Sequence, residues 1–126
     1  LTRDFDDLSI GDYVCTSGGN SGQHCGLRVS KMLVWWNDGY GGFNNIQADE
    51  PSGGLAVVAG DSGGPVFTSN GSGYAWAAGM IQASTNTITC PSGAARYLPN
   101  TCASSVLFTS MRTITQYTAG WTLRIG

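Results

Sequence analysis

The segment Gly60-Asp61-Ser62-Gly63-Gly64-Pro65 constrains the fold of this chain more than any other stretch. An apolar run at 55–59 leads into it, and a strand-like run at 66–68 leads out of it. The glycines on both sides of Ser62 permit backbone angles that other residues resist, and they allow another molecule to approach the main chain closely. The segment therefore predicts a tight turn between two strands that presents a serine.

A serine in such a turn has two interpretations. It is a plain turn residue, or it is a nucleophile, which must be held against a base and an anion-stabilising site. In the second case the main-chain N–H groups of Gly60 and Ser62 point toward one position and form an oxyanion hole. All six residues occur together in a glycine-rich, low-charge chain with four cysteines, and this combination favours the nucleophile.

Composition places the chain among β-rich extracellular proteins rather than helical cytosolic ones. Charged residues make up 11% of the 126 residues and glycine accounts for 19 of them, against usual shares of about 25% and about 7%. This length suffices for one small domain with its own core. The net charge is −2, the basic residues are scattered and no apolar run is long enough to span a membrane, so we expect neither a nucleic-acid nor a membrane partner.

The four cysteines predict two disulfides. Cys15, Cys25, Cys90 and Cys102 form no CxxC pair, and His24 is the one histidine of the chain, so we expect no metal site and no cofactor. An even number of cysteines in a low-charge chain favours disulfides and an oxidising compartment. Three connectivities are possible, and we predict the local one, which joins Cys15 to Cys25 and Cys90 to Cys102.

Apolar runs separated by glycine-rich turns predict an antiparallel all-β fold. Strands at 12–16 and 25–29 flank a turn cluster at 17–22, which gives a hairpin that the first disulfide would staple. Residues 1–10 have the character of a linker. The strand at 25–29 is expected to continue at 31–36, and further strands are expected at 46–48, 66–68, 74–85 and 105–108. We also expect a turn at Asn70-Gly71 and a short C-terminal helix at 110–118.

Two segments carry a resemblance to a known family. The Gly60–Pro65 segment resembles the nucleophile motif of the chymotrypsin-like serine proteases. The pattern GxxVCxSGxxSGxxCG at 11–26 is similar to the opening hairpin of the second barrel in secreted bacterial members such as α-lytic protease and the streptogrisins. The resemblance covers residues 11–126 and implies an antiparallel Greek-key barrel, the C-terminal barrel of a two-barrel fold, with the first barrel absent from this chain.

The resemblance also assigns roles within the turn. It implies that Ser62 is the nucleophile and that the N–H groups of Gly60 and Ser62 form the oxyanion hole. It implies that Asp61 is not a triad acid but makes a buried ion pair that fixes the loop. Relatives often carry a basic residue where this chain has Thr16, which leaves Arg28 as a candidate partner for Asp61.

Substrate contacts follow from the same resemblance. One segment is implied to form the base of the primary specificity pocket, and a second is implied to pair with the substrate main chain. The first segment has no acid where trypsin-like enzymes place an aspartate, so we expect an apolar residue before the cleaved bond. The first segment, the pocket base, consists of Gly54, Leu55 and Ala56. The second segment, which pairs with the substrate, consists of Gln82, Ala83 and Ser84.

The implied function is that of a secreted serine endopeptidase that hydrolyses peptide bonds in proteins or peptides through an acyl-enzyme. The family's catalytic His and Asp lie in the first barrel, and the resemblance gives His24 no role as a base. We therefore expect this chain to be inactive alone, with the N-terminal barrel of the same protein as its partner. The competing hypothesis is a catalytically inactive, protease-like binding module for protein or glycan, against which the retention of Ser62 and its glycines argues.

Overall fold

The computed structural model describes residues 8–37, 42–69, 75–94 and 101–111. The expected turn at Asn70-Gly71 lies outside these residues, as do residues 1–7 of the expected linker and 112–118 of the expected C-terminal helix. The described residues form seven strands and no helix, and Ser110, where a helix was expected to begin, is the last residue of a strand. The all-β prediction is therefore confirmed.

Every strand pairing is antiparallel. The strands are β1 Tyr13–Gly18, β2 Gly22–Asn37, β3 Gly42–Asp49, β4 Val57–Val58, β5 Pro65–Ser69, β6 Ala75–Ile88 and β7 Cys102–Ser110. The strand expected at 25–29 and its expected continuation at 31–36 form the single long strand β2. The short strand β4 lies within the apolar run at 55–59 and is the strand expected before the Gly60–Pro65 turn.

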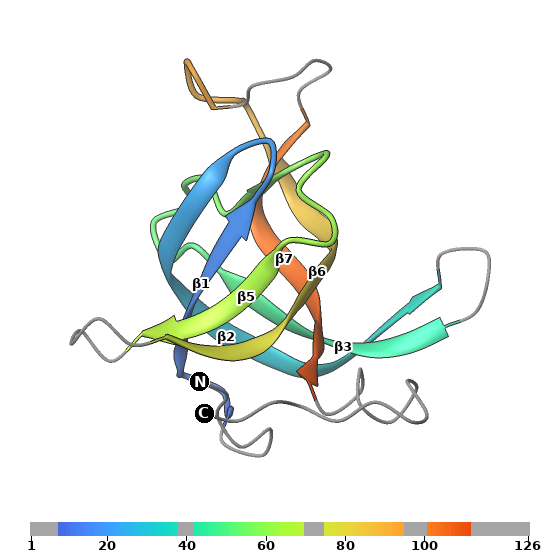
Figure 1. Cartoon of the computed structure of the whole chain (residues 1–126). Helices are drawn as coiled ribbons and strands as arrows, with labels where there is room; N and C mark the ends of the chain where they lie inside the picture. Colours follow the sequence, from blue (N-terminus) through green and yellow to red (C-terminus); the bar gives the residue numbers. More distant parts are fainter. Residues whose placement is uncertain (1–7, 38–41, 70–74, 95–100, 112–126) are drawn as a thin grey trace.

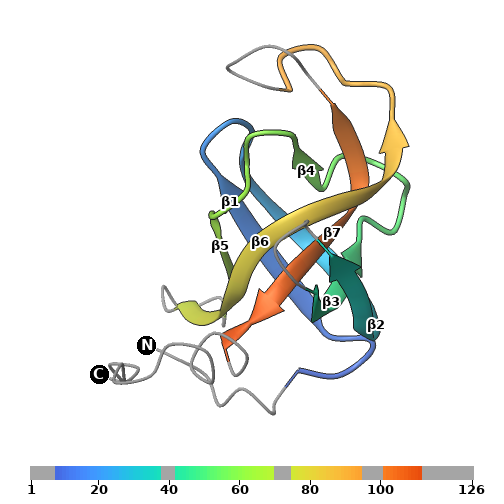
Figure 2. The same ribbon diagram turned by 90° about the vertical axis from the view of Figure 1, so that its right-hand side faces the viewer.

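The sheet closes on itself to form a barrel. The strand order is β3-β2-β1-β5-β6-β7-β4, and β3 also pairs with β7. Six strands therefore wrap round a common interior, as Figure 1 and Figure 2 show from two directions, while β4 lies beside the upper part of β7. Closure removes the free edges that an open sheet of this size would expose.

Side chains alternate between the interior and the surface of the barrel, as the pleat of a strand requires. In β2, for example, Leu27 and Val29 are buried while Arg28 between them is exposed. All seven strands contribute to the apolar interior, and its main members are Val14, Leu27, Val29, Ile46, Ala48, Val57, Val66, Ile81, Val106 and Phe108. The far ends of β2 and β3 extend beyond this core as a two-stranded arm (Figure 1).

Both predicted disulfides are present. The Cα atoms of Cys15 and Cys25 are 4.0 Å apart, and those of Cys90 and Cys102 are 5.2 Å apart. The first distance is slightly below the range of about 4.4–6.8 Å that is usual for disulfides. The Cys15–Cys25 bridge joins β1 to β2 where the pairing register shifts between Val14 and Thr16. The two bridges are compatible with an extracellular protein.

Candidate active site around Ser62

The Gly60–Gly64 turn links β4 to β5 and is held by its own main chain. The N–H of Asp61 donates to the carbonyl of Val58 at 3.0 Å, and the N–H of Gly64 donates to the carbonyl of Asp61 at 3.0 Å. The φ angle of Gly60 is +97°, in the left-handed region that residues with a Cβ rarely adopt. A glycine before the aspartate is therefore a requirement of this turn.

The main-chain N–H groups of the turn fall into two sets. Those of Asp61, Gly63 and Gly64 donate to carbonyl groups of the protein. Those of Gly60 and Ser62, both exposed residues, donate to no acceptor among the described residues. These N–H groups of Gly60 and Ser62 are the two that the sequence predicts to form an oxyanion hole. An anion bound at these two groups would not have to displace an internal hydrogen bond.

Ser62 lies next to β6. Its Oγ is 3.5 Å from the carbonyl oxygen of Gln82, a contact at the outer limit of a hydrogen bond. The turn is fixed on the same strand, because Gly63 donates to the carbonyl of Ile81 at 2.9 Å and Ile81 donates to the carbonyl of Gly64 at 2.8 Å. The structure thus places the predicted nucleophile beside the segment 82–84, whose three residues are half-buried.

No base is hydrogen-bonded to Ser62 within the described ranges. The half-buried His24 lies on β2, and its Nε2 is 3.0 Å from the Oγ of Ser21. Ser21 in turn donates its hydroxyl to a carboxylate oxygen of Asp61. A serine, a histidine and an aspartate are therefore connected here, but the serine lies between the other two. In a catalytic triad the histidine takes that central position.

Asp61 is buried, with 1% of its surface exposed, and its partners differ from those expected. The donors to its carboxylate in the described structure are main-chain N–H groups of Asn20, Ser21 and Val58 and the hydroxyl of Ser21. All of them are uncharged. Arg28, the candidate ion-pair partner, is exposed and is not among them.

The predicted pocket base at 54–56 runs from the surface into the core. The N–H of Gly54 donates to the carboxylate of Glu50, and Leu55 is half-buried. Ala56 is completely buried, and its carbonyl accepts the hydroxyl of Thr16 at 3.2 Å. Thr16 therefore ties this segment to β1. The role of the three residues in substrate binding stays a prediction.

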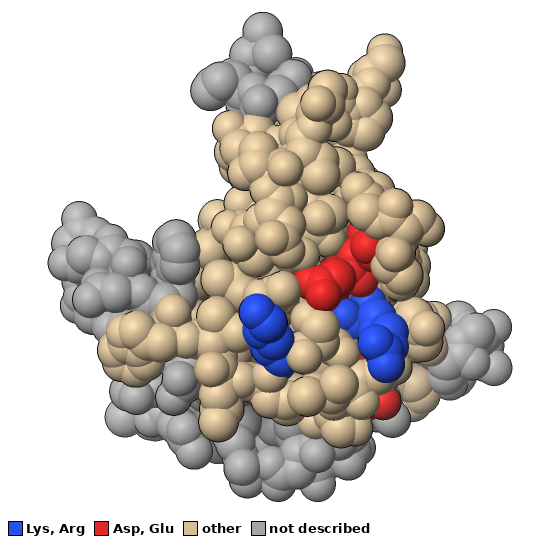
Figure 3. Space-filling view, turned by 180° about the vertical axis from the view of Figure 1, so that it is seen from behind, with Lys and Arg blue, Asp and Glu red and all other residues tan. Residues whose placement is uncertain are grey.

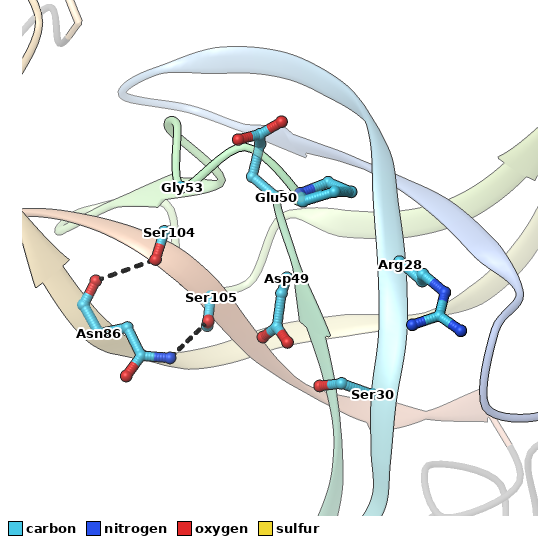
Figure 4. A pocket seen from close by; sticks show the side chains of 9 residues that line it. Arg28, Ser30, Asp49, Glu50, Gly53, Asn86, Ser104 and Ser105 are labelled. Carbon is cyan, nitrogen blue, oxygen red and sulfur yellow. Dashed lines mark hydrogen bonds between the residues drawn. The ribbon is translucent and has the colours of Figure 1, made fainter.

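A polar pocket of about 420 Å³ lies elsewhere on the barrel and was not expected from the sequence. Charged side chains gather on the corresponding face of the molecule (Figure 3), and Figure 4 shows the residues that line the pocket. Asn86 connects two strands there, because its Nδ2 donates to the hydroxyl of Ser105 at 2.8 Å and its carbonyl accepts the hydroxyl of Ser104 at 3.3 Å. Arg28 and Glu50 also line this pocket.

Asp49, also on the wall of this pocket, has a lowered pKa. Partial burial raises its pKa, but the nearby hydroxyl of Ser105, the amide of Gln47 and the charge of Lys31 together hold it below the ordinary value. The Nε2 of Gln47 donates to the carboxylate at 2.9 Å. The folded structure therefore favours the ionised form of Asp49.

Within the described part of the chain, no group of three or more His, Cys, Asp or Glu side chains is placed to hold a metal ion. The same residues include no helix that is long and apolar enough to cross a membrane. No family model, curated protein or solved structure matches this chain. Its function is therefore inferred from the residues and geometry of the site.

Proposed function

We propose that this chain is the nucleophile-bearing barrel of a secreted serine endopeptidase. Ser62 is the nucleophile, and the N–H groups of Gly60 and Ser62 are the oxyanion hole. The observation that carries the proposal is the pairing pattern of the turn, in which these two N–H groups have no acceptor in the part of the chain that the structure describes, while their neighbours have one. They flank the buried Asp61 in a turn that is fixed to β6 and that presents the exposed Ser62.

We further propose that the barrel has Greek-key connectivity and is the C-terminal barrel of a two-barrel enzyme. Its strand order supports this, because β1, β2 and β3 follow one another round the barrel while β5, β6 and β7 return from β1 to β3. The connection that carries Ser62 leads from β4 into β5 at the point where the chain enters its second set of strands. The partner is the N-terminal barrel of the same protein.

The proposed reaction is acyl transfer. The Oγ of Ser62 attacks the carbonyl carbon of a peptide bond, and a histidine from the N-terminal barrel accepts the hydroxyl proton and passes it to the leaving amine. The negative charge that develops on the carbonyl oxygen is stabilised by the two N–H groups. Water then hydrolyses the acyl-enzyme and restores Ser62. The substrate main chain lies along 82–84, and an apolar side chain enters toward 54–56.

The alternative is a protease-like barrel that binds protein or glycan without catalysis. One observation favours it. On the arm formed by β2 and β3, Leu33 and Trp35 have 79% and 64% of their surface exposed. Exposed aromatic side chains with one apolar face are common in binding surfaces. In this case Ser62 would have no chemical role.

The experiment that separates the two is active-site labelling of the full-length protein encoded by the reading frame that contains this chain. We expect a fluorophosphonate to label the protein and peptides to be cleaved, and we expect both rates to fall more than about 10³-fold in Ser62→Ala. Ser52→Ala is the matched control, because Ser52 is also an exposed serine in a loop. Equal labelling of the Ser62→Ala and unsubstituted proteins would leave the binding module as the better assignment.

The 126-residue chain alone gives a second readout. Without a base Ser62 stays protonated at neutral pH, so we expect no useful peptide hydrolysis and slow labelling. Addition of the N-terminal barrel should restore both. Fast labelling of the chain alone that is lost in Ser62→Ala and in His24→Ala would instead show that His24 acts as the base.

A further inference from the structure

The four donors to the carboxylate of Asp61 form what we call the Asp61 cage. Its Oδ1 accepts the N–H groups of Asn20 and Ser21, each at 2.9 Å, and its Oδ2 accepts the N–H of Val58 at 2.9 Å and the hydroxyl of Ser21. A carboxylate that is 1% exposed is costly unless its oxygens are hydrogen-bonded. The cage meets this cost without a cation, and Ser21 supplies two of its four donors.

The cage joins the β1–β2 hairpin to the Ser62 turn. Asn20 and Ser21 lie in the hairpin turn, and the Nδ2 of Asn20 also donates to the carbonyl of Ala59 at 2.7 Å. Ala59 and Asp61 are thus both held by contacts to a segment about forty positions earlier in the chain. The N–H groups of Gly60 and Ser62 flank Asp61, so their directions depend on how firmly its side chain is held.

The hydroxyl of Ser21 has one proton and two neighbours that compete for it. It can donate to Asp61 if it accepts a hydrogen bond from His24, whose Nε2 is 3.0 Å away. If the Nε2 of His24 lacked a proton, Ser21 would donate to the imidazole and present a lone pair to the carboxylate. The buried charge of Asp61 favours the first arrangement. The hydrogen bonds then run in one direction, from His24 to Ser21 to Asp61.

We propose that Ser21 and His24 are positioning residues for the Ser62 turn, and that His24 acts by keeping a proton on Nε2 so that the Ser21 hydroxyl is donated to Asp61. This role rests on the proposed function because the turn it fixes is the proposed reacting turn. Both the neutral Nε2–H tautomer and the imidazolium supply the required donor. The arrangement therefore persists when His24 gains or loses the proton on Nδ1.

The first part of the test needs no catalysis and uses NMR on the 126-residue chain. We expect the ring nitrogen signals of His24 to show a protonated Nε2 at every pH at which the chain is folded. We expect Ser21→Ala and His24→Leu to move the amide signals of Gly60 and Ser62, because the first removes a donor to Asp61 and the second removes the group that orients the Ser21 hydroxyl. Ser21→Thr and His24→Gln keep a hydroxyl and an Nε2 donor, and they should retain the wild-type signals.

The second part measures fluorophosphonate labelling of the full-length protein. Displacement of reacting groups by a small distance costs large factors in rate, so we expect Ser21→Ala and His24→Leu to label at least about tenfold more slowly. Ser21→Thr and His24→Gln should restore the rate with an unchanged pH profile. A base could not be replaced by glutamine in this way.

The outcomes separate this proposal from the proposed function. An unprotonated Nε2 on His24, or unmoved Gly60 and Ser62 amide signals in both Ser21→Ala and His24→Leu, would overturn the positioning role. If Ser21→Ala fails to fold, the result for His24→Leu decides the test, because a substitution at the half-buried His24 should leave the fold intact. Moved amide signals together with a full-length protein that does not label would uphold the positioning role and reject the endopeptidase.

Discussion

At the scale of single residues, Gly18 shows how closely the hairpin and the Ser62 turn are packed. A Cβ added at Gly18 would lie 2.1 Å from the Cγ of Asp61, a side chain that is buried and held by the cage. Neither partner can move away without breaking hydrogen bonds. The requirement for glycine here comes from a residue that is distant in the sequence, not from the conformation of the hairpin.

We therefore expect Gly18→Ala to lower the free energy of unfolding by about 1–3 kcal/mol, the usual cost of overpacking a filled site. Gly19→Ala is the matched control, because nothing lies within 4 Å of a Cβ at that neighbouring position. Urea unfolding of the two variants is the measurement. Equal stabilities would show that Asp61 is not fixed as described.

Asp49 gives a residue-scale prediction about pH. Its pKa is lowered from 3.8 in the folded chain, so its contribution to stability is fully present above that value and is lost as the pH falls through the lower folded value. We expect Asp49→Asn to be less stable than the wild type at about pH 6 and this difference to shrink toward about pH 2. Gln47→Ala, which removes one donor to Asp49, should show a smaller change of the same sign. Urea unfolding across this pH range tests both, and a difference independent of pH would contradict the assignment.

At the scale of elements, the β1–β2 hairpin has a double role. It is a barrel hairpin stapled by Cys15–Cys25, and its turn carries three of the four donors of the Asp61 cage. The second bridge, Cys90–Cys102, joins the segment after β6 to the start of β7 and has no described contact with the cage. The two disulfides close loops of similar length but should differ in their effect on the Ser62 turn.

We expect replacement of either cysteine pair by alanine to cost about 2–3 kcal/mol of stability, from the loop entropy of the unfolded chain. Loss of Cys15–Cys25 should also increase hydrogen exchange at the amides of Asn20 and Ser21, which donate to Asp61. Loss of Cys90–Cys102 should leave those amides protected and serves as the control. Hydrogen exchange measured by NMR distinguishes the two variants. Equal protection of these amides in both would show that the Cys15–Cys25 disulfide does not stabilise the Asp61 cage.

At the scale of the whole molecule, the barrel depends on the pairing of β3 with β7, two strands far apart in the sequence. Phe108 lies at this closure, opposite Ile46 on β3 and Ile81 on β6, and it is completely buried. It is also the largest fully buried side chain among the described residues. Its packing holds together strands from both halves of the chain.

We expect Phe108→Ala to lower the free energy of unfolding by about 3–5 kcal/mol, because it removes apolar contacts and leaves a cavity at the closure. Leu33→Ala, on the exposed arm, should change stability by less than about 0.5 kcal/mol. Chemical unfolding measures both. If the Phe108 variant does not fold, Phe108→Leu should show a reduced loss of the same sign. A Phe108 variant as stable as the Leu33 variant would argue against closure through this residue.

The sequence alone was sufficient for features that depend on short stretches of chain. The all-β class follows from runs with a period of two, and the turn around Ser62 follows from its glycines. Both disulfides were predicted correctly because each joins cysteines that are close in the sequence, with separations of 10 and 12 residues. These are local properties, and neighbouring residues determine them.

Tertiary structure decided which distant groups meet. Three of the four donors to Asp61 come from a segment about forty residues away, and they are two main-chain N–H groups and a serine hydroxyl rather than the arginine that the sequence suggested. The Asn20-Ser21 pair in the hairpin turn was the one available signal, since such residues readily form turn hydrogen bonds. The contact of Ser62 with Gln82, the β3–β7 closure and the polar pocket depend in the same way on strand register. A shift of one residue in register turns every side chain of a strand to its other face, so local patterns cannot specify these contacts.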